Sequence, residues 1–495
     1  AVARHSLATR DITLAAVRRA LMALIVHFPI YRTYADDGGR PELDAPFFDQ
    51  AMAGARGELS PPDAEVLAWL ERWLGGEAPA DAPDAEERWL RQRAITRFQQ
   101  LTSPVAAKAV EDTAGYRSAA LISRNDVGFD GEHFSHPPRW FHDANAWRAR
   151  HFPHGLVTTA THDHKRGEDV RARLAALSEH AGAFATRVEG WRELAAPLRH
   201  RLPSGLAPSP GDELILYQML LGAWPPKTER NDTDSMQRFA ERLAQWQQKA
   251  LREAKLRTHW LWPDEDYESA CRSYLEALLA SPELSRELEA AARELDLSGA
   301  LNGLAQTALR LTVPGVPDLY QGCEFWDYSL VDPDNRRPVD HAAREATLVA
   351  ATDPAAALVH WQDGHVKQGL IARLLALRHD CHALFHHGDY LPLGVEGEQG
   401  ERLVAFLRRH GDRQLLVVVP RLCASLLAGS EQPLVPPSRW SDTRVNLPGE
   451  TGTAWQNVLT GTTLGVRNEH VAAEELLDAF PVGIYLRNRY RHRES

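Results

Sequence analysis

The segment that carries the clearest chemistry is His162-Asp163-His164-Lys165-Arg166. It follows a strand-like run, residues 155–160, and precedes a helical pattern. An imidazole and a carboxylate can each make directional hydrogen bonds to neighbouring sugar hydroxyls, and a basic pair balances buried negative charge. Barrel enzymes keep such groups at the C-terminal ends of their strands. By spacing alone, the segment fits equally well a helix cap formed by Asp163 and a solvated basic turn.

Four longer runs of the sequence occur in an order that matches one enzyme family. They are RFQQLTSPV at 97–105, which continues to 114, ELILYQMLLGAWP at 213–225, PGVPDLYQG at 314–322 and DPDNRRPVD at 332–340. They resemble maltooligosyl trehalose synthase of the α-amylase superfamily, and the resemblance spans roughly residues 10 to 420. It implies an isomerase of trehalose biosynthesis that converts the reducing-end α-1,4 bond of a maltooligosaccharide substrate into an α,α-1,1 bond. The implied route is intramolecular transglycosylation through a glycosyl-enzyme, with no metal and no organic cofactor.

Two motifs of that superfamily are absent from the sequence. Retaining glycosidases use two carboxylates about 5–5.5 Å apart, one as the nucleophile and one as the general acid. The superfamily's nucleophile lies in a Gly-x-Arg-x-Asp strand, and neither this pattern nor Asp-x-x-x-Asn-His occurs here. We therefore expect the chain to be the C-terminal portion of the enzyme and to be inactive alone. An upstream polypeptide would then carry the nucleophile and the general acid.

The resemblance assigns roles around the His-Asp pair. Asp163 matches the third acidic residue of the superfamily, which helps to distort the ring at subsite −1, and His162 would bind the same ring. Lys165 and Arg166 match a basic pair that would hold the cleaved sugar while it turns; the alternative is a solvated helix start. The family usually has Thr at position 164, and we expect the larger His164 to point away from the sugar.

Further substrate-binding residues are expected on other segments. By the same resemblance these are Arg32, Glu111, Asp112, Tyr116, Asp334, Asn335, Arg336 and Arg337. Glu111 and Asp112 fit equally well a helix cap and an ion pair with Lys108 or Arg117. The 334–337 segment alone would read as a turn. Tyr116 is of a type that stacks on sugar faces.

Composition excludes several classes of protein. The formal net charge of −11 over 495 residues argues against a general nucleic-acid binder. The four cysteines, at 271, 323, 381 and 423, have no zinc-site spacing and favour reduced buried thiols in a cytoplasmic protein. No apolar run reaches membrane-spanning length.

The periodicity of the sequence divides it into segments. We expect a helix from Thr9 to Phe28, a short strand at 30–34 with Arg32 at its end, and mainly helices at 62–115 and 167–300. Runs with period two at 402–407 and 414–419 predict strands. The resulting fold class is α/β: a partial (β/α)8 barrel with large helical insertions, followed by a C-terminal all-β sandwich. The expected segments are 1–95 (helical insertion and barrel), 96–174 (barrel with the His-Asp site), 175–300 (helical insertion), 301–385 (last barrel strand and substrate loop) and 386–495 (sandwich).

Two other functions remain open at the level of sequence. A wetter pocket would make the same superfamily fold an α-glucan hydrolase, and His164 is the reason to keep this reading. The missing carboxylates favour a non-catalytic, carbohydrate-binding half that needs a partner chain.

Overall fold

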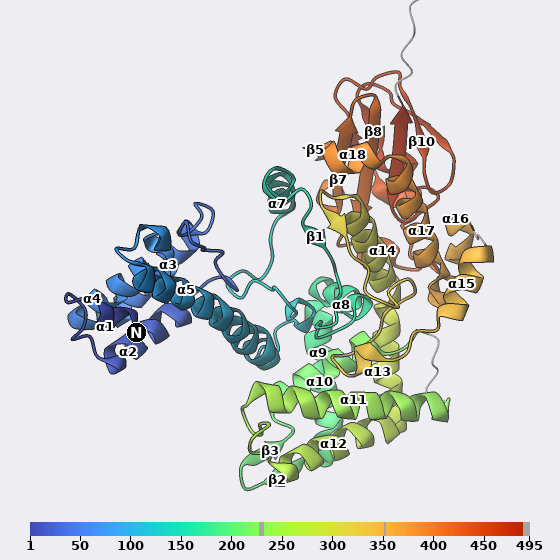
Figure 1. Ribbon diagram of the computed structural model, residues 1–495. Helices are drawn as coiled ribbons and strands as arrows, with labels where there is room; N and C mark the ends of the chain where they lie inside the picture. The colour runs from blue at the N-terminus through green and yellow to red at the C-terminus, as the bar shows by residue number, and fades with distance from the viewer. Residues whose placement is uncertain (227–231, 351–352, 489–495) are drawn as a thin grey trace, which may run out of the picture. The chain divides into compact units, whose positions relative to one another are not determined.

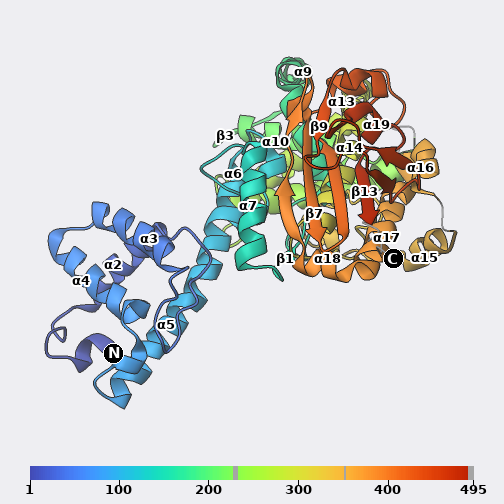
Figure 2. The same ribbon diagram turned by 90° about the horizontal axis from the view of Figure 1, so that it is seen from above.

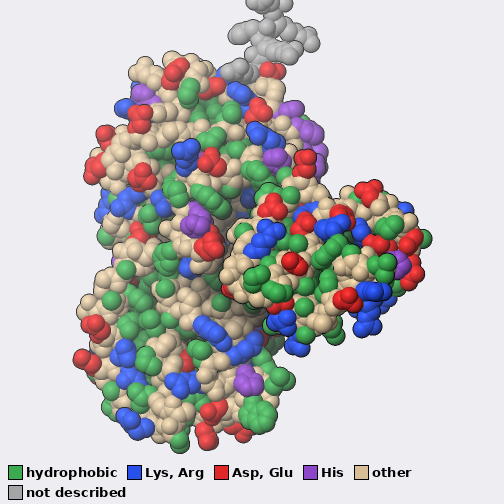
Figure 3. Space-filling model, turned by 90° about the vertical axis from the view of Figure 1, so that its left-hand side faces the viewer, with side chains coloured by type: hydrophobic (Ala, Val, Ile, Leu, Met, Phe, Trp, Pro, Cys, Tyr) green, Lys and Arg blue, Asp and Glu red, His purple; other side chains and the backbone are tan. Residues whose placement is uncertain are grey.

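The computed structural model describes residues 1–226, 232–350 and 353–488. The chain forms two compact units, residues 1–115 and residues 116 onward (Figure 1). Within the described ranges, no helix is both long enough and apolar enough to cross a membrane. On the face shown in Figure 3, acidic and basic side chains are interspersed.

The first unit consists of helices around a small apolar core. Leu24, Phe48, Leu67 and Phe98 meet in this core. The helices are α1 (Val2–His5), α2 (Leu14–Val26), α3 (Ala45–Glu58), α4 (Pro61–Glu71) and α5 (Ala85–Ala106), which continues as a π-helical segment η3 (Ala107–Ala114). The predicted N-terminal helix is confirmed in shortened form, because the Thr13 side chain caps it by accepting a hydrogen bond from the amide of Ala16.

The strand predicted at 30–34 is wrong. This segment is a loop whose backbone groups bond to side chains instead of to a neighbouring strand. The amide of Tyr34 donates to Asp44, and the amide of Ala35 donates to Oε1 of Gln99 at 2.7 Å. Gln99 Nε2 in turn donates to the carbonyl of Ala35 at 3.1 Å. A sequence rich in β-branched and aromatic residues therefore forms a loop here and joins no sheet.

The second unit contains a short parallel pair of strands. β1 (Leu156–Val157) lies beside β4 (Val316–Pro317), with Leu156 paired to Val316. This is the only parallel pair in the described part of the chain. Helix α8 (Glu168–Ala175) follows β1, and α14 (Asp296–Thr312), which precedes β4, packs against α8 and α17 (His365–Asp380). Strand, loop and helix thus place the His-Asp segment after the end of β1, as expected.

The predicted helical region between β1 and β4 is confirmed. After α8 it holds α9 (Ala181–Leu194), a small hairpin of β2 (His200–Leu202) and β3 (Gly205–Ala207), α10 (Pro210–Ala223), α11 (Thr233–Ala254), α12 (Glu265–Ala280) and α13 (Pro282–Glu294). Its helices bury a core that includes Trp191, Trp224 and Trp246. This group of helices contacts α8 through α10.

The C-terminal region is an antiparallel β structure. The strands predicted at 402–407 and 414–419 are confirmed as β7 (Leu403–His410) and β8 (Arg413–Pro420). They lie inside a six-stranded sheet of order β11-β10-β13-β8-β7-β5, next to a three-stranded sheet of order β12-β9-β6. The other strands are β5 (Asp389–Pro392), β6 (Val395–Glu396), β9 (Arg444–Asn446), β10 (Ala454–Asn457), β11 (Thr463–Gly465), β12 (His470–Ala472) and β13 (Gly483–Asn488).

Both faces of the larger sheet are buried. Alternate residues of β7 point to opposite faces. Leu403, Ala405 and Leu407 share a core with the smaller sheet. Val404 and Phe406 belong instead to a core that they share with residues of α14 and α17. Figure 2 shows these two helices beside the sheet. The sheet is therefore one layer of a larger body that also contains the helices behind it.

Candidate active site

The loop from Thr161 to Gly167 connects β1 to α8 and presents the predicted His-Asp pair. His162 is exposed, and the side chain of Asp163 is 43% exposed. Lys165 lies beneath, only 3% exposed at its side chain, with its Nζ 3.3 Å from Oδ2 of Asp163. A carboxylate that is open to solvent on one side and paired with a buried ammonium on the other can bond sugar hydroxyls without leaving the lysine unpaired.

A carboxylate from another loop fixes the backbone under this pair. Oδ2 of Asp126 accepts hydrogen bonds from the amides of Lys165 and Arg166 at 3.1 and 3.2 Å. The Asn125-Asp126 sequence signals a turn, but nothing in it indicates a partner 39 residues further along. Asp126 is therefore a site-building residue that sequence reasoning missed.

Arg166 lies in the interior. It is 1% exposed, and its Nη1 donates to the carbonyl of Asn125 at 2.7 Å. Burial lowers the pKa of this guanidinium. These contacts tie the site loop to the segment at 125–126, and the predicted grip of Arg166 on a sugar stays a prediction.

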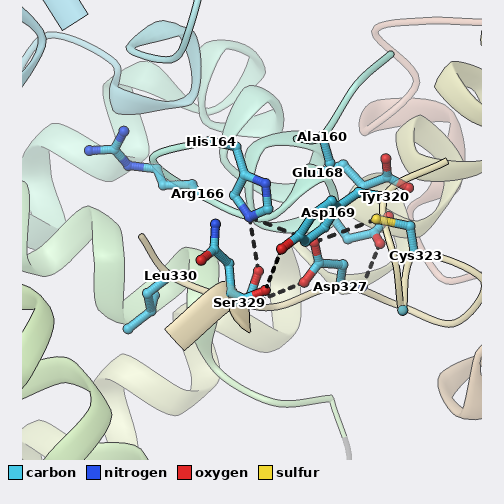
Figure 4. A network of polar contacts seen from close by, with 12 residues as sticks. Ala160, His164, Arg166, Glu168, Asp169, Tyr320, Cys323, Asp327, Ser329 and Leu330 are labelled. Carbon is cyan, nitrogen blue, oxygen red and sulfur yellow. Dashed lines mark hydrogen bonds and ion pairs between the residues drawn. The ribbon is translucent and has the colours of Figure 1, made fainter. Parts of the chain in front are cut away.

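His164 also points into the interior, where it is 2% exposed. Its Nε2 lies 3.1 Å from Oγ of Ser329 and 4.0 Å from Oδ2 of Asp327, and its ring meets the edge of Tyr320 (Figure 4). Asp327 accepts from the amide of Ser329 at 3.0 Å, so the histidine is anchored on the loop that follows β4.

Below the loop lies a buried network of two acids and two bases, drawn in part in Figure 4. Glu168 accepts from Nη1 of Arg310 at 2.7 Å and lies 2.6 Å from Nζ of Lys367. The same Nζ donates to Asp169 at 2.6 Å. Burial acts to raise the pKa of Glu168, but the charges of Lys367 and Arg310 outweigh it and bring the pKa to about 2. Helices α8, α14 and α17 are thereby joined directly behind the site loop.

The segment at 334–337 divides between the site and a structural turn. Nδ2 of Asn335 donates to the carbonyl of His162 at 3.1 Å, so Asn335 supports the site loop. Asp334 faces the other way and accepts two bonds from Arg242, at 2.8 and 2.9 Å. Burial opposes ionisation of Asp334, yet the bond and charge of Arg242 lower its pKa. Arg336 and Arg337 are about half exposed and pair with Asp332 and Asp334.

The remaining predicted residues lie apart from this loop in sequence. Arg32, Glu111 and Asp112 belong to the first unit. There the hydroxyl of Tyr31 donates to Glu111, Lys108 pairs with Asp112, and Arg32 lies over the ring of Tyr34. The Lys108 pair is the alternative foreseen for Asp112. Tyr116 opens the second unit and is buried in its helical core. Substrate roles for these four residues stay predictions.

Known proteins resemble this chain along most of its length. No family model matches the sequence. A Mycobacterium tuberculosis protein named as a maltooligosyl trehalose synthase is 36% identical over 392 residues, which cover 79% of this chain and 45% of that protein. A solved structure of maltooligosyltrehalose synthase from Arthrobacter ramosus is 32% identical, with a TM-score of 0.71 over 96% of this chain and 54% of that one. A Sulfolobus tokodaii structure of the same name, 23% identical with a TM-score of 0.64, shows the same fold.

The chain thus spans about half the length of the relatives it matches. The sequence comparison and the structure comparison lead to proteins of the same name. Each covers most of the chain, including the loop that carries Asp163. Over most of its length, the chain is similar in both sequence and structure to maltooligosyl trehalose synthases.

Proposed function

We propose that this chain provides the part of a maltooligosyl trehalose synthase that holds the third acidic residue, Asp163, and the floor of the sugar site. The observation that carries the proposal is the exposed Asp163 carboxylate, backed by Lys165, at the end of a parallel strand in a chain related to these enzymes. Asp163 would bond hydroxyls of the ring at the cleaved bond. In this proposal β1 and β4 belong to a barrel whose other strands, with the nucleophile and the general acid, come from sequence outside this chain.

In the complete site the reaction would proceed without loss of atoms. The nucleophile takes the anomeric carbon of the maltooligosyl part, while the general acid protonates the glycosidic oxygen of the terminal glucose. The freed glucose turns within the pocket, and its anomeric hydroxyl attacks the glycosyl-enzyme as the acid, now a base, takes the proton. Exclusion of water decides between isomerisation and hydrolysis.

The test pairs this chain with the part of the Mycobacterium tuberculosis relative that it does not match. Maltohexaose is the substrate, and loss of reducing ends is measured together with release of glucose. We expect no turnover by either part alone, and loss of reducing ends when both are present. Asp163→Asn in the pair should lower the rate at least about 10³-fold, whereas Asp389→Asn, on β5, should not.

Each other outcome contradicts part of the proposal. Release of glucose without loss of reducing ends would identify an α-glucan hydrolase. Turnover by this chain alone would show that it holds its own nucleophile. If the mixture with Asp163→Asn were as active as the mixture with Asp389→Asn, and both kept full activity, Asp163 would have no role in the reaction.

A further inference from the structure

A second cluster of chemically active side chains lies outside the sugar site, in the loop between η4 (Ile122–Arg124) and α7 (Pro138–His151). Asp130, His133 and His136 bring one oxygen and two ring nitrogens within 4.8 Å of one another. Oδ2 of Asp130 lies 2.8 Å from Nδ1 of His133 and 3.3 Å from Nε2 of His136. None of these three residues is among those that we assign to the sugar site.

The two separations from Oδ2 of Asp130 are close to those around a small tetrahedral ion. With metal–nitrogen distances of about 2.0–2.1 Å, the ligand atoms of a tetrahedral zinc site lie about 3.3 Å apart. Two imidazoles and one carboxylate are donors that suit Zn²⁺ and neighbouring transition metals better than Mg²⁺ or Ca²⁺. Asp130 and His133 are 40% and 62% exposed at their side chains, which leaves a position open for water.

The loop around the three ligands is held in place. Oδ1 of Asp130 accepts from the amides of Glu132 and His133, at 2.8 and 3.2 Å, which leaves Oδ2 facing the two rings. Arg124 donates to the carbonyl of His133 at 2.6 Å and to that of Asp130. The ring of His136 stacks on Trp140 of α7, with centroids 4.1 Å apart. Ligands that are oriented before the ion arrives bind it with less loss of entropy.

We propose that Asp130, His133 and His136 form a binding site for one transition-metal ion of the Zn²⁺ class. This departs from the metal-free protein that the sequence resemblance implies. Bound metal would fasten the 125–137 loop to the first turn of α7. That loop starts next to Asp126, whose carboxylate holds the amides of Lys165 and Arg166. The ion would therefore brace the support of the sugar loop without touching the sugar.

The test is a competition titration of Zn²⁺ against a chromophoric chelator, on the 495-residue chain. We expect one tight equivalent, with a Kd below about 10 µM. Asp130→Asn, His133→Gln and His136→Gln should each weaken that equivalent at least about tenfold. Unchanged far-UV circular dichroism would show that the variants remain folded.

A matched control is available because histidines gather elsewhere. His382 and His386, on α18 (His382–His387), stack with centroids 4.0 Å apart, and His154 lies beside them. The double variant His382→Gln with His386→Gln should retain the tight equivalent. If that variant loses it and the three loop variants keep it, the ion binds at α18 and the proposal is wrong. A Kd weaker than about 1 mM in the unaltered chain would overturn the proposal as well.

A second readout locates the ion in the loop. Limited proteolysis within residues 125–137 should slow at least about threefold in saturating Zn²⁺, and this protection should vanish in His136→Gln. Protection that persists in His136→Gln, or none in the unaltered chain, would contradict a site at these residues.

Discussion

Asp163 can face solvent because neighbouring side chains hold its loop in place and balance its charge. Asp126 binds two amides of the loop, and Lys165 neutralises the carboxylate from below. Behind them, Glu168 and Asp169 are balanced by Arg310 and Lys367. Buried charges persist in a fold when they are paired and hydrogen-bonded. The site loop therefore rests on an interior whose net charge is close to zero.

Acid should weaken this interior. The pKa of Glu168 is about 2 in the folded protein, below its ordinary 4.5, so its ionised form stabilises the fold above about pH 4.5. That contribution is lost as the pH falls toward 2. Burial raises the pKa of Asp169, in the same network, to about 6, so this second acid has the opposite effect between about pH 6 and pH 4. We expect the free energy of unfolding, from urea titrations, to fall between about pH 4 and pH 2, as Glu168 is protonated.

The double variant Glu168→Gln with Arg310→Met removes one charge of each sign and is the matched comparison. Its free energy of unfolding should fall less steeply over the same pH range. Equal slopes for the two proteins would mean that Glu168 titrates normally.

At this scale the sequence indicates candidate residues within one loop but not the distant residues that support that loop. A motif marks Asp163 and Lys165, because the spacing of residues within one loop is visible in the sequence. The partners of that loop come from afar: Lys367 is 198 residues from Asp169, and Asp126 is 39 residues from Lys165. Pairings over such distances depend on how helices pack, and a single sequence does not encode them in any local pattern.

Among the elements, α8 is the one that connects the site to the rest of the second unit. It packs against α10 and α14, and small residues allow the close approach. A Cβ at Gly222 of α10 would lie 2.7 Å from Cγ of Leu174, and one at Gly299 of α14 would lie 2.8 Å from Cα of Arg173. Glycine at these points is a condition of packing, since neither position has a positive φ.

Substitution of two helical glycines should therefore have opposite effects. Gly222→Ala is expected to destabilise the protein by about 1–3 kcal/mol, because Leu174 must move. Gly190→Ala, within α9, meets no atom within 4 Å and should stabilise it by about 0.5–1 kcal/mol. Chemical denaturation of both variants measures the difference; two changes of the same sign would show that helix propensity alone decides.

Local sequence patterns predicted the regular elements. They failed where side chains, instead of a neighbouring strand, bond the backbone. The apolar run within 402–407 lies in β7 (Leu403–His410), where consecutive side chains are buried because both faces of the sheet are covered. The run at 30–34 has strand-forming residues, but the amide of Tyr34 donates to Asp44, and the backbone of the adjacent Ala35 bonds to Gln99. The barrel was inferred from resemblance, and the described residues supply only β1 and β4 in parallel.

For the whole molecule, the main feature is that each unit has its own core. The first unit packs Leu24, Phe48, Leu67 and Phe98 among its own helices. A polypeptide of residues 1–115 should accordingly fold alone, since a compact unit with its own core is stable without its neighbour. We expect helical circular dichroism and one cooperative thermal transition. A gradual, non-cooperative loss of signal would show that this core needs the rest of the chain.

The sheet that is buried on both faces has a consequence for where damage is felt. Val404 and Phe406 pack against α14 and α17, the helices that bear Arg310 and Lys367. These two cations form ion pairs with Glu168, the first residue of α8. On the same strand, Arg408 donates a hydrogen bond to the carbonyl of Thr312, the last residue of α14. None of the strands of this sheet carries a residue that we assign to the sugar site. Even so, a cavity on the face toward α14 and α17 should shift α8, and with it the loop that carries Asp163.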